Sequence, residues 1–408
     1  MPEEEKLDTL IEIIRHRRSV RKYESEAVAP EAAVCAVQAA LRSPACSKTP
    51  SWNVQIFFEP KLKERFRRAV LAGLKGRLNT WLDTKEIPAM VCLTALPEKA
   101  PRKGDKLFYL LEASIAFENF VLAARAAGLG TCWIGAFNEP PVMHTLEIEP
   151  GNRIVAVSPL GNPYKRPLSP LDITGQYDRY ARRRLHESRR PLTEIVFSNR
   201  YDSPADWPLT PDPAALDGCR SSEMKPEEIV PGLLSALEFP TAFAKKAVGE
   251  RKLNWLLEAA RLAPSASNSQ MWRFVVIRDK ERLAELESCA HNDVGLQVPF
   301  SEAPVVIALL ADQWMIRARG EEQPYFMIDV PIALSHILLM ASDLGLAANV
   351  VLHFNESRVR RAVQAPMHAR VVALLALGYP PQRGKTGDFP EHLVLPKRDR
   401  TKGVEIIR

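Results

Sequence analysis

The sequence has little that would build a metal site or a fold held by disulfides. Its six cysteines are scattered over 408 residues, and no two of them form a CxxC pair. This spacing argues against zinc and iron–sulfur sites and against a disulfide framework. It suits a reducing compartment, so we expect a cytoplasmic protein without a bound metal.

Long apolar runs and a strong charge of one sign are also lacking. No run approaches the roughly 18 apolar residues that a membrane span needs. The opening stretch MPEEEKLDTL has no apolar core of a signal peptide. The net charge of +6 and the pI of about 8.9 are only mildly basic. We therefore expect neither a membrane nor a nucleic-acid partner.

What the chain does contain is one order of elements that occurs twice. In each half an Ala-rich helix precedes a strand, a second strand, a long apolar helix that ends at glycine, and a last strand closed by a Gly-x-Pro turn. The expected helices are 30–42, 108–127, 252–262 and 328–344, and the expected strands are 54–58, 89–93, 154–157, 274–277, 304–309 and 371–377.

The two halves align with a nearly constant offset. Pro44 matches Pro264 at 220 residues, while Gly128 matches Gly345 and Gly161 matches Gly378 at 217. We interpret this as an internal duplication, with a first copy over 5–198 and a second, degenerate copy over 228–408. Residues 199–227 between them carry five prolines among Asp, Ser and Gly, which predicts an extended linker.

Strands separated by long helices in each copy predict an α+β fold, with a mixed sheet flanked by helices in each of two tandem domains. Two like domains in one chain can pack as an intrachain pseudo-dimer. Such a chain is compatible with a monomer, because both halves of a dimer are already present.

The stretch Arg17-Arg18-Ser19-Val20-Arg21 follows a helical pattern. If it runs extended, Arg17, Ser19 and Arg21 share one face, since side chains two apart point the same way. Guanidinium groups bind phosphate by charge-assisted hydrogen bonds, so this face could hold a phosphate. The alternative is a solvated basic helix end, where cations complement the helix dipole.

A second stretch, Ala263 to Trp272 (APSASNSQMW), follows a helix and precedes a strand. Its small residues let the backbone approach a ligand, and its Ser and Asn side chains supply hydroxyl and amide partners. Taken alone it is equally typical of a structural turn.

Together RRSVRKY, APSASNSQMW, GLGTCWIG and the closing LGNP and LGYP resemble the nitroreductase family of FMN-dependent oxidoreductases. The resemblance covers nearly the whole chain, once per copy, as in a fused two-copy member. It implies two α/β sandwich domains and FMN at the interface between them, with each site built from both copies.

The resemblance also assigns cofactor-binding residues. Phosphate, ribityl chain and ring edge would be held by the first copy's arginine stretch, with late basic residues near the phosphate. Backbone N–H groups of the loop after GLG would face the flavin, and the PSASN stretch of the second copy would close the site. The residues are Arg17, Arg18, Ser19, Arg21, Trp133, Ile134, Gly135, Ala136, Arg189, Arg190, Pro264, Ser265, Ala266, Ser267 and Asn268, with Arg18 pointing away if the alternation holds.

The departures from the family pattern fall on complementary halves. In the second copy, Leu237, Phe239 and Thr241 replace the arginine stretch, and in the first copy Ala45, Lys48 and Pro50 replace the polar PSASN partners. One site would therefore keep both of its halves while the other lost both. We predict one flavin site per chain, between the copies.

By resemblance, the activity is hydride transfer from NAD(P)H through flavin N5 to a nitroaromatic, quinone or similar small-molecule acceptor in a ping-pong cycle. NAD(P)H would bind transiently, and no catalytic side chain is assigned. Two alternatives are a non-catalytic protein that sequesters flavin and a scaffold that has lost flavin. His336, in an apolar helix, is interpreted as a satisfied core histidine rather than a ligand.

Overall fold

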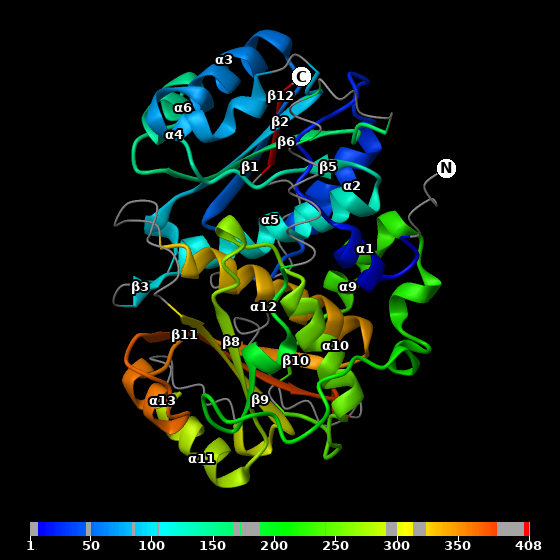
Figure 1. Cartoon of the computed structure of the whole chain (residues 1–408), viewed down its shortest axis with the longest axis vertical. Helices are drawn as coiled ribbons and strands as arrows, with labels where there is room; N and C mark the ends of the chain where they lie inside the picture. The colour runs from blue at the N-terminus through cyan, green and yellow to red at the C-terminus, as the bar shows by residue number, and fades with distance from the viewer. Residues whose placement is uncertain are drawn as a thin grey trace.

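The computed structural model describes residues 7–45, 50–83, 86–100, 102–103, 106–165, 172, 176, 188–240, 242–290, 300–312, 324–381 and 404–407. Two five-stranded sheets lie on opposite sides of a central layer of helices (Figure 1). The chain is thus an α+β protein, as predicted.

The two sheets have the same strand order when the copies are matched. The first runs β12-β1-β2-β6-β5 and the second runs β7-β8-β9-β11-β10, so the sequence duplication is also a structural one. The strands are β1 (Trp52–Phe57), β2 (Ala89–Ala95), β5 (Gly130–Thr131), β6 (Arg153–Gly161), β7 (Val196–Ser198), β8 (Trp272–Ile277), β9 (Val305–Asp312), β10 (Ala347–Val351), β11 (Ala369–Gly378) and β12 (Val404–Ile407), and β3 (Arg102–Lys103) and β4 (Lys106–Leu107) form a separate short ladder.

Each copy gives its last strand to the other copy's sheet. β7 of the first copy pairs in parallel with β8, and β12 of the second copy pairs in parallel with β1. The other ladders described in the two sheets are antiparallel. This reciprocal exchange ties the halves into a pseudo-dimer, so the sequence boundaries at 198 and 228, which stay a prediction, do not separate the two sheets.

Helices fill the space between and around the sheets. α5 and α12 lie at the centre and pack on each other, while α1, α2, α9 and α10 surround them (Figure 1). The helices are α1 (Leu10–His16), α2 (Pro30–Leu41), α3 (Pro60–Leu71), α4 (Gly73–Gly76), α5 (Phe108–Ala126), α6 (Glu139–Thr145), α8 (Leu192–Ile195), α9 (Pro226–Ala236), α10 (Glu250–Arg261), α11 (Lys280–Cys289), α12 (Phe326–Asp343) and α13 (Glu356–Ala362), with 3₁₀ turns η1 (Arg77–Leu82), η2 (Pro97–Lys99), η3 (Pro213–Leu216), η4 (Arg220–Glu223), η5 (Ala266–Asn268) and η6 (Phe300–Glu302).

The expectation that no segment is long and apolar enough to span a membrane needs correction. By length and composition α12 is apolar enough to cross a membrane, with a mean hydropathy of 1.4 over 18 residues. The helix is wholly buried between the two copies, and a core helix of this kind meets the same criteria. Its apolar surface is therefore already covered by the fold.

The segment between the copies is more ordered than an extended linker. Trp207 is buried and its indole N–H donates to Asn254 of α10. Ser221 donates its backbone N–H and its hydroxyl to Asp343 at the end of α12. This proline-rich stretch therefore runs as a strap that is fixed to the second copy's helices.

The arginine stretch runs extended, which is the condition under which Arg17, Ser19 and Arg21 were expected to share a face, and it lies along the short strand β5. Ser19 is bridged to Thr131, and the backbone N–H of Val20 donates to the carbonyl of Thr131. A Cβ at Gly130 would fall 2.8 Å from a Val20 methyl carbon. Glycine at this position therefore permits the close approach that brings the arginines to the interface between the copies.

Candidate functional site

A cavity of about 1030 Å³ lies between the two copies. It is large for a small-molecule pocket, for which about 300–1,000 Å³ is usual. All the predicted cofactor-binding residues line it except Arg190. The lining also includes Arg15, His16, Asn79, Arg261, Gln270, Tyr325 and Asp329.

The first copy lines the cavity with Arg17, Arg18 and Arg21, which we call the arginine wall. Arg17 follows α1, its side chain is 8% exposed, and its Nε lies 3.9 Å from Oε1 of Glu118. Burial lowers the pKa of Arg17, and the charge of Glu118 opposes that shift. The Nε atoms of Arg17 and Arg18 are buried and have no hydrogen-bond partner among the described residues. A buried guanidinium N–H without a hydrogen-bond partner favours an acceptor supplied by a ligand, such as a phosphate oxygen.

Arg18 departs from the expected alternation. The alternation would turn it away from the phosphate face, but it lines the same cavity as Arg17 and Ser19. The stretch is held by isolated bridges, at Ser19 and Tyr23, rather than by a continuous ladder. A stretch held at two points does not keep the strict two-residue period of a strand.

Arg189 reaches the cavity from the end of the first copy and uses its hydrogen bonds on the second. Its guanidinium donates to the carbonyls of Arg261, Leu262 and Ala263, where α10 ends. Such carbonyls have no partner within a helix, so Arg189 caps α10 and fixes the start of the PSASN stretch. Burial lowers the pKa of Arg189 to about 9, and the charges of Arg17 and Arg261 act in the same direction.

Arg190 points elsewhere. Its backbone N–H donates to Gln270, and its side chain pairs with Glu194, 3.2 Å away and four residues along the chain. Of the two late basic residues that the sequence offered, Arg189 is thus the one placed at the cavity.

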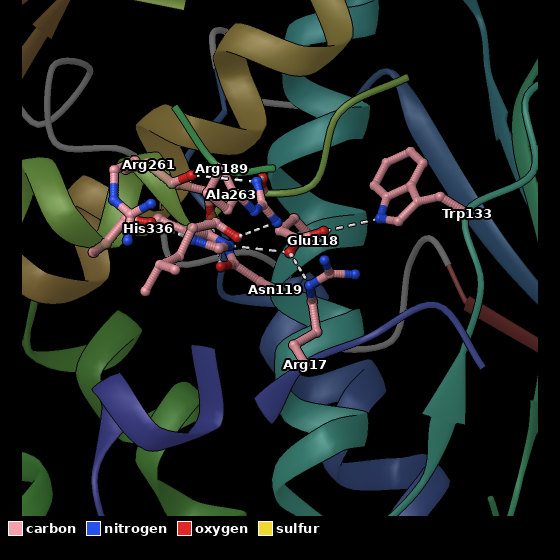
Figure 2. Close-up of polar contacts among 11 residues, drawn as sticks. Arg17, Glu118, Asn119, Trp133, Arg189, Arg261, Ala263 and His336 are labelled. Atoms are coloured by element: carbon pink, nitrogen blue, oxygen red, sulfur yellow. Dashed lines mark hydrogen bonds and ion pairs between the residues drawn. The ribbon is translucent and has the colours of Figure 1, made fainter. Parts of the chain in front are cut away.

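The loop after β5 forms a second part of the wall. Ile134 is bridged to Val157 of β6, and Asn79 donates its side-chain amide to the carbonyl of Ala136. Trp133 is half-buried, and its indole N–H donates to Oε2 of Glu118 at 2.8 Å (Figure 2). These contacts fix the loop at both ends, with Gly135 beside the ring of Tyr325.

The PSASN stretch closes the cavity from the second copy. Ser267, Asn268 and Gln270 have positive φ values of 51°, 55° and 48°, so the chain turns tightly here. Both carboxylate oxygens of Asp329 accept from the backbone N–H of Ala266 at 3.1 Å. Burial raises the pKa of Asp329 to about 7, against the opposing effect of its hydrogen bonds from Ala266 and Ser269.

The charge around the cavity is strongly positive. Six arginines line it, and Asp329 is the one carboxylate among the described lining residues. An anion such as a phosphate monoester, with a charge of about −1.5 to −2 near neutral pH, would balance this excess. The sequence did not point to Arg15, Arg261 or Asp329, because each lies within a helical pattern that gives no sign of which side faces the interface.

The pseudo-equivalent region on the other side is built differently. Leu237 stands where Arg17 stands in the first copy, and Thr241, the equivalent of Arg21, lies outside the described residues. His353 takes the position of Ala136, and its ring lies 5.4 Å from that of the buried Phe108, the equivalent of Tyr325. Leu237, Glu238 and Phe239 thus stand where Arg17, Arg18 and Ser19 stand in the first copy, and the aromatic His353 takes the place of Ala136 in the loop.

Two further expectations can be compared with the structure. His336 is fully buried, and both of its ring nitrogens are hydrogen-bonded, to the Ala259 carbonyl and to Glu118. It is a satisfied core histidine, as predicted. Among the described residues no cluster of three or more His, Cys, Asp or Glu could hold a metal ion, and the five described cysteines form no disulfide with one another.

These features define a class: a duplicated α+β protein with exchanged edge strands and an arginine-rich cavity shared by its two copies. The model of the nitroreductase family matches residues 14–162 and 242–379, one match in each copy and together well over half of the chain. The chain belongs to the nitroreductase family, a family of oxidoreductases, as the sequence motifs predicted.

Individual relatives resemble one copy at a time. The NADH dehydrogenase of Thermus thermophilus is 33% identical over 180 residues, which cover 37% of this chain and 84% of the relative. The FMN reductase [NAD(P)H] of Bacillus subtilis is 27% identical over 106 residues, or 26% of this chain and 41% of that protein. An FMN-dependent nitroreductase structure from Clostridium difficile R20291 is 26% identical and covers 38% of this chain and 91% of its own, with a TM-score of 0.33.

Proposed function

We propose that this protein is an FMN-dependent oxidoreductase that passes hydride from NAD(P)H to a nitroaromatic, quinone or similar acceptor, with one flavin site per chain. The observation that carries the proposal is the arginine-rich cavity to which the intact motifs of both copies contribute. The names of the Thermus and Bacillus relatives, an NADH dehydrogenase and an FMN reductase, support the choice of donor and cofactor.

The residues present fit FMN. The buried, unpartnered Nε atoms of Arg17 and Arg18 and the excess of positive charge suit the cofactor's phosphate. When bound, FMN would supply the ability to accept and return a hydride at N5, which no amino-acid side chain provides.

The side chains of this site bind and orient rather than react. Arg17, Ser19 and Arg21 would hold the phosphate and ribityl chain, with Arg18 beside them. Arg189, whose terminal nitrogens already serve carbonyls of residues 261–263, would act through its charge and by fixing Pro264. By the family resemblance, the backbone from Trp133 to Ala136 would face the ring, and the bonds of Asn79 and Glu118 hold that loop in place.

The PSASN residues would close the site from the opposite copy. Ser265 already accepts from the backbone N–H of Gln270, and Asn268 donates to Ser188. The loop is therefore ordered by its own bonds and by Asp329. A pre-ordered wall costs less entropy when a ligand binds than one that must fold around it.

Spectroscopy of the purified chain tests this proposal. Flavin per chain is quantified after saturation with FMN, and the visible spectrum is recorded anaerobically before and after NADH or NADPH. We expect one flavin that is bleached by the nucleotide and reoxidised by a nitroaromatic or quinone. Failure to bind FMN would contradict the proposal.

A second candidate function rests on the altered pseudo-equivalent region. If one of two original flavin sites has been lost, the remaining site could bind flavin without catalysing its reduction and reoxidation. The same experiment separates the two functions, because a bound flavin that neither NADH nor NADPH bleaches would favour sequestration.

A further inference from the structure

Two polar pairs join α5 to α12 near the pseudo-twofold axis. With the offset of 217 residues, Glu118 corresponds to Ser335 and Asn119 to His336. Glu118 Oε1 lies 3.0 Å from His336 Nε2, and Ser335 Oγ donates to Asn119 Oδ1 at 2.7 Å. The two contacts are therefore symmetry-related, but one joins ionisable groups and the other joins neutral ones.

The ionisable pair lies behind the arginine-rich cavity. Glu118 and His336 are fully buried, and neither lines the cavity. From one carboxylate, however, Glu118 contacts two residues that do line it: Trp133 at 2.8 Å and Arg17 at 3.9 Å (Figure 2). His336 reaches that carboxylate from the other copy.

The hydrogen positions at His336 follow from its partners. A backbone carbonyl only accepts, so Nδ1, 2.9 Å from the Ala259 oxygen, must carry a hydrogen. A second hydrogen then lies between Nε2 and Glu118 Oε1, on one or the other. The imidazole is held at both nitrogens, and its ring cannot turn without breaking a buried bond.

We infer that His336 is a positioning residue for the flavin site: it fixes the Glu118 carboxylate, which in turn fixes the Arg17 side chain and the Trp133 loop. This inference rests on the proposed function, because it takes Arg17 and the Trp133 loop to be positioned for binding flavin. The second copy thereby contributes to the arginine wall of the first without touching the ligand. The neutral pair, Asn119 with Ser335, gives the other side no carboxylate to hold an arginine.

Three variants test this inference. His336→Leu removes the bond to Glu118. Glu118→Gln keeps an amide that can accept from Trp133 and donate to Nε2, so it is the conservative variant. Ser335→Ala removes the symmetry-related hydrogen bond to Asn119 and is the matched control. It leaves in place the contacts of Glu118 with Arg17 and Trp133.

The first measurement uses flavin-free protein. The indole N–H resonance of Trp133, assigned by its loss in Trp133→Phe, is recorded in ¹⁵N-tryptophan-labelled chain. We expect His336→Leu to move this resonance, Glu118→Gln to keep it dispersed with a smaller change, and Ser335→Ala to leave it in place. A Trp133 resonance unmoved by His336→Leu would overturn the inference, whatever the flavin result.

The second measurement is FMN affinity by fluorescence quenching. His336→Leu should weaken FMN binding by about tenfold, because Arg17 and the Trp133 loop would then have to be ordered when the ligand binds. Ser335→Ala should change it by less than about twofold. Equal losses in both variants would indicate a general loss of packing and overturn the inference. Absence of FMN binding in the unaltered chain would instead overturn the proposed function.

If His336→Leu does not fold, the double variant Glu118→Ser with His336→Asn replaces it. This variant copies the neutral pair that already folds on the other side of the axis. Normal FMN affinity and an unmoved Trp133 resonance in the double variant would contradict the positioning role of the Glu118–His336 pair, and a loss of both would support it.

Discussion

The two halves of this chain share a fold but differ in charge where a ligand would bind. Both sheets have the same strand order, and both receive their edge strand from the other copy. At the interface, Arg17 of the first copy faces a cavity, whereas Leu237 takes its place in the second. The scaffold therefore stays symmetric while the site does not.

The same contrast appears behind the cavity. Glu118 and His336 form a buried ionisable pair beside Arg17, and their counterparts Ser335 and Asn119 form a neutral one. A fused pair of copies can differ in this way because each position is encoded twice. In a homodimer a change at one position would alter both sites at once.

Arg17→Leu gives the first copy the residue of the second and should have the largest effect. Removing a buried cation from an anion site typically costs roughly 3–5 kcal/mol, a few hundredfold or more in affinity. We expect little or no FMN to copurify, with an unchanged circular dichroism spectrum. Leu237→Ala is the matched control and should retain flavin.

Asp329→Asn tests the carboxylate that orders the PSASN stretch. The folded pKa of Asp329 is about 7, raised by burial from an ordinary value of 3.8. Its contribution to stability is therefore fully present below about pH 4 and is lost as pH rises towards 7. That loss is on the order of 2–4 kcal/mol, because each tenfold change in proton affinity corresponds to about 1.4 kcal/mol.

The asparagine variant cannot ionise, so its free energy of unfolding should vary less between pH 4 and pH 7 than that of the unaltered chain. Urea titrations at several pH values measure this. An identical pH dependence in the two proteins would show that folding does not raise the pKa of Asp329.

Gly161→Ala and Gly378→Ala alter the same turn in the two copies. A Cβ at Gly161 would lie 2.6 Å from Pro88 and 3.0 Å from Tyr23, and one at Gly378 would lie 2.6 Å from Phe243. Each should lower the free energy of unfolding by about 1–3 kcal/mol through overpacking. Only Gly161→Ala should also weaken FMN binding, because Tyr23 continues the arginine stretch. Equal losses of FMN affinity in the two variants would contradict this difference between the copies.

His353→Ala should have the smallest effect. It trims the ring that contacts Phe108 on the altered side, so the free energy of unfolding should fall by about 1 kcal/mol. Flavin should stay at one per chain, because space alone does not restore the missing arginines. A second flavin in this variant would mean that steric blocking, rather than lost charge, closed that side.

The sequence predicted the scaffold well because its signals are local and repeated. The glycines that end α5 and α12 and the offsets of 217 and 220 residues identified the copies, and the apolar pattern of α5 identified a buried helix. The motifs also named nine of the fifteen first-copy residues that line the cavity, and missed those contributed by α1 and by more distant segments, such as Arg15 and Asn79. Alternation failed at Arg18, since two isolated bridges do not impose a strand's period.

Other features depend on contacts between the copies, which no single stretch encodes. The exchange of β7 and β12 and the ordering of residues 199–227 arise only when both halves are folded. Asp329 and Glu118 sit in helices that are buried all round, so their sequence context does not show which neighbour they meet. Arg189 and Arg190 are adjacent, and only the end of α10 distinguishes them.

The most direct test of the central claim is the number and place of bound flavins. A crystal structure of the FMN-saturated chain, with the flavin quantified in the same preparation, gives both. We predict one FMN per chain, bounded by Arg17 on one side and Pro264 on the other. Two equivalent flavins per chain, or one bound beside Leu237, would contradict this asymmetry.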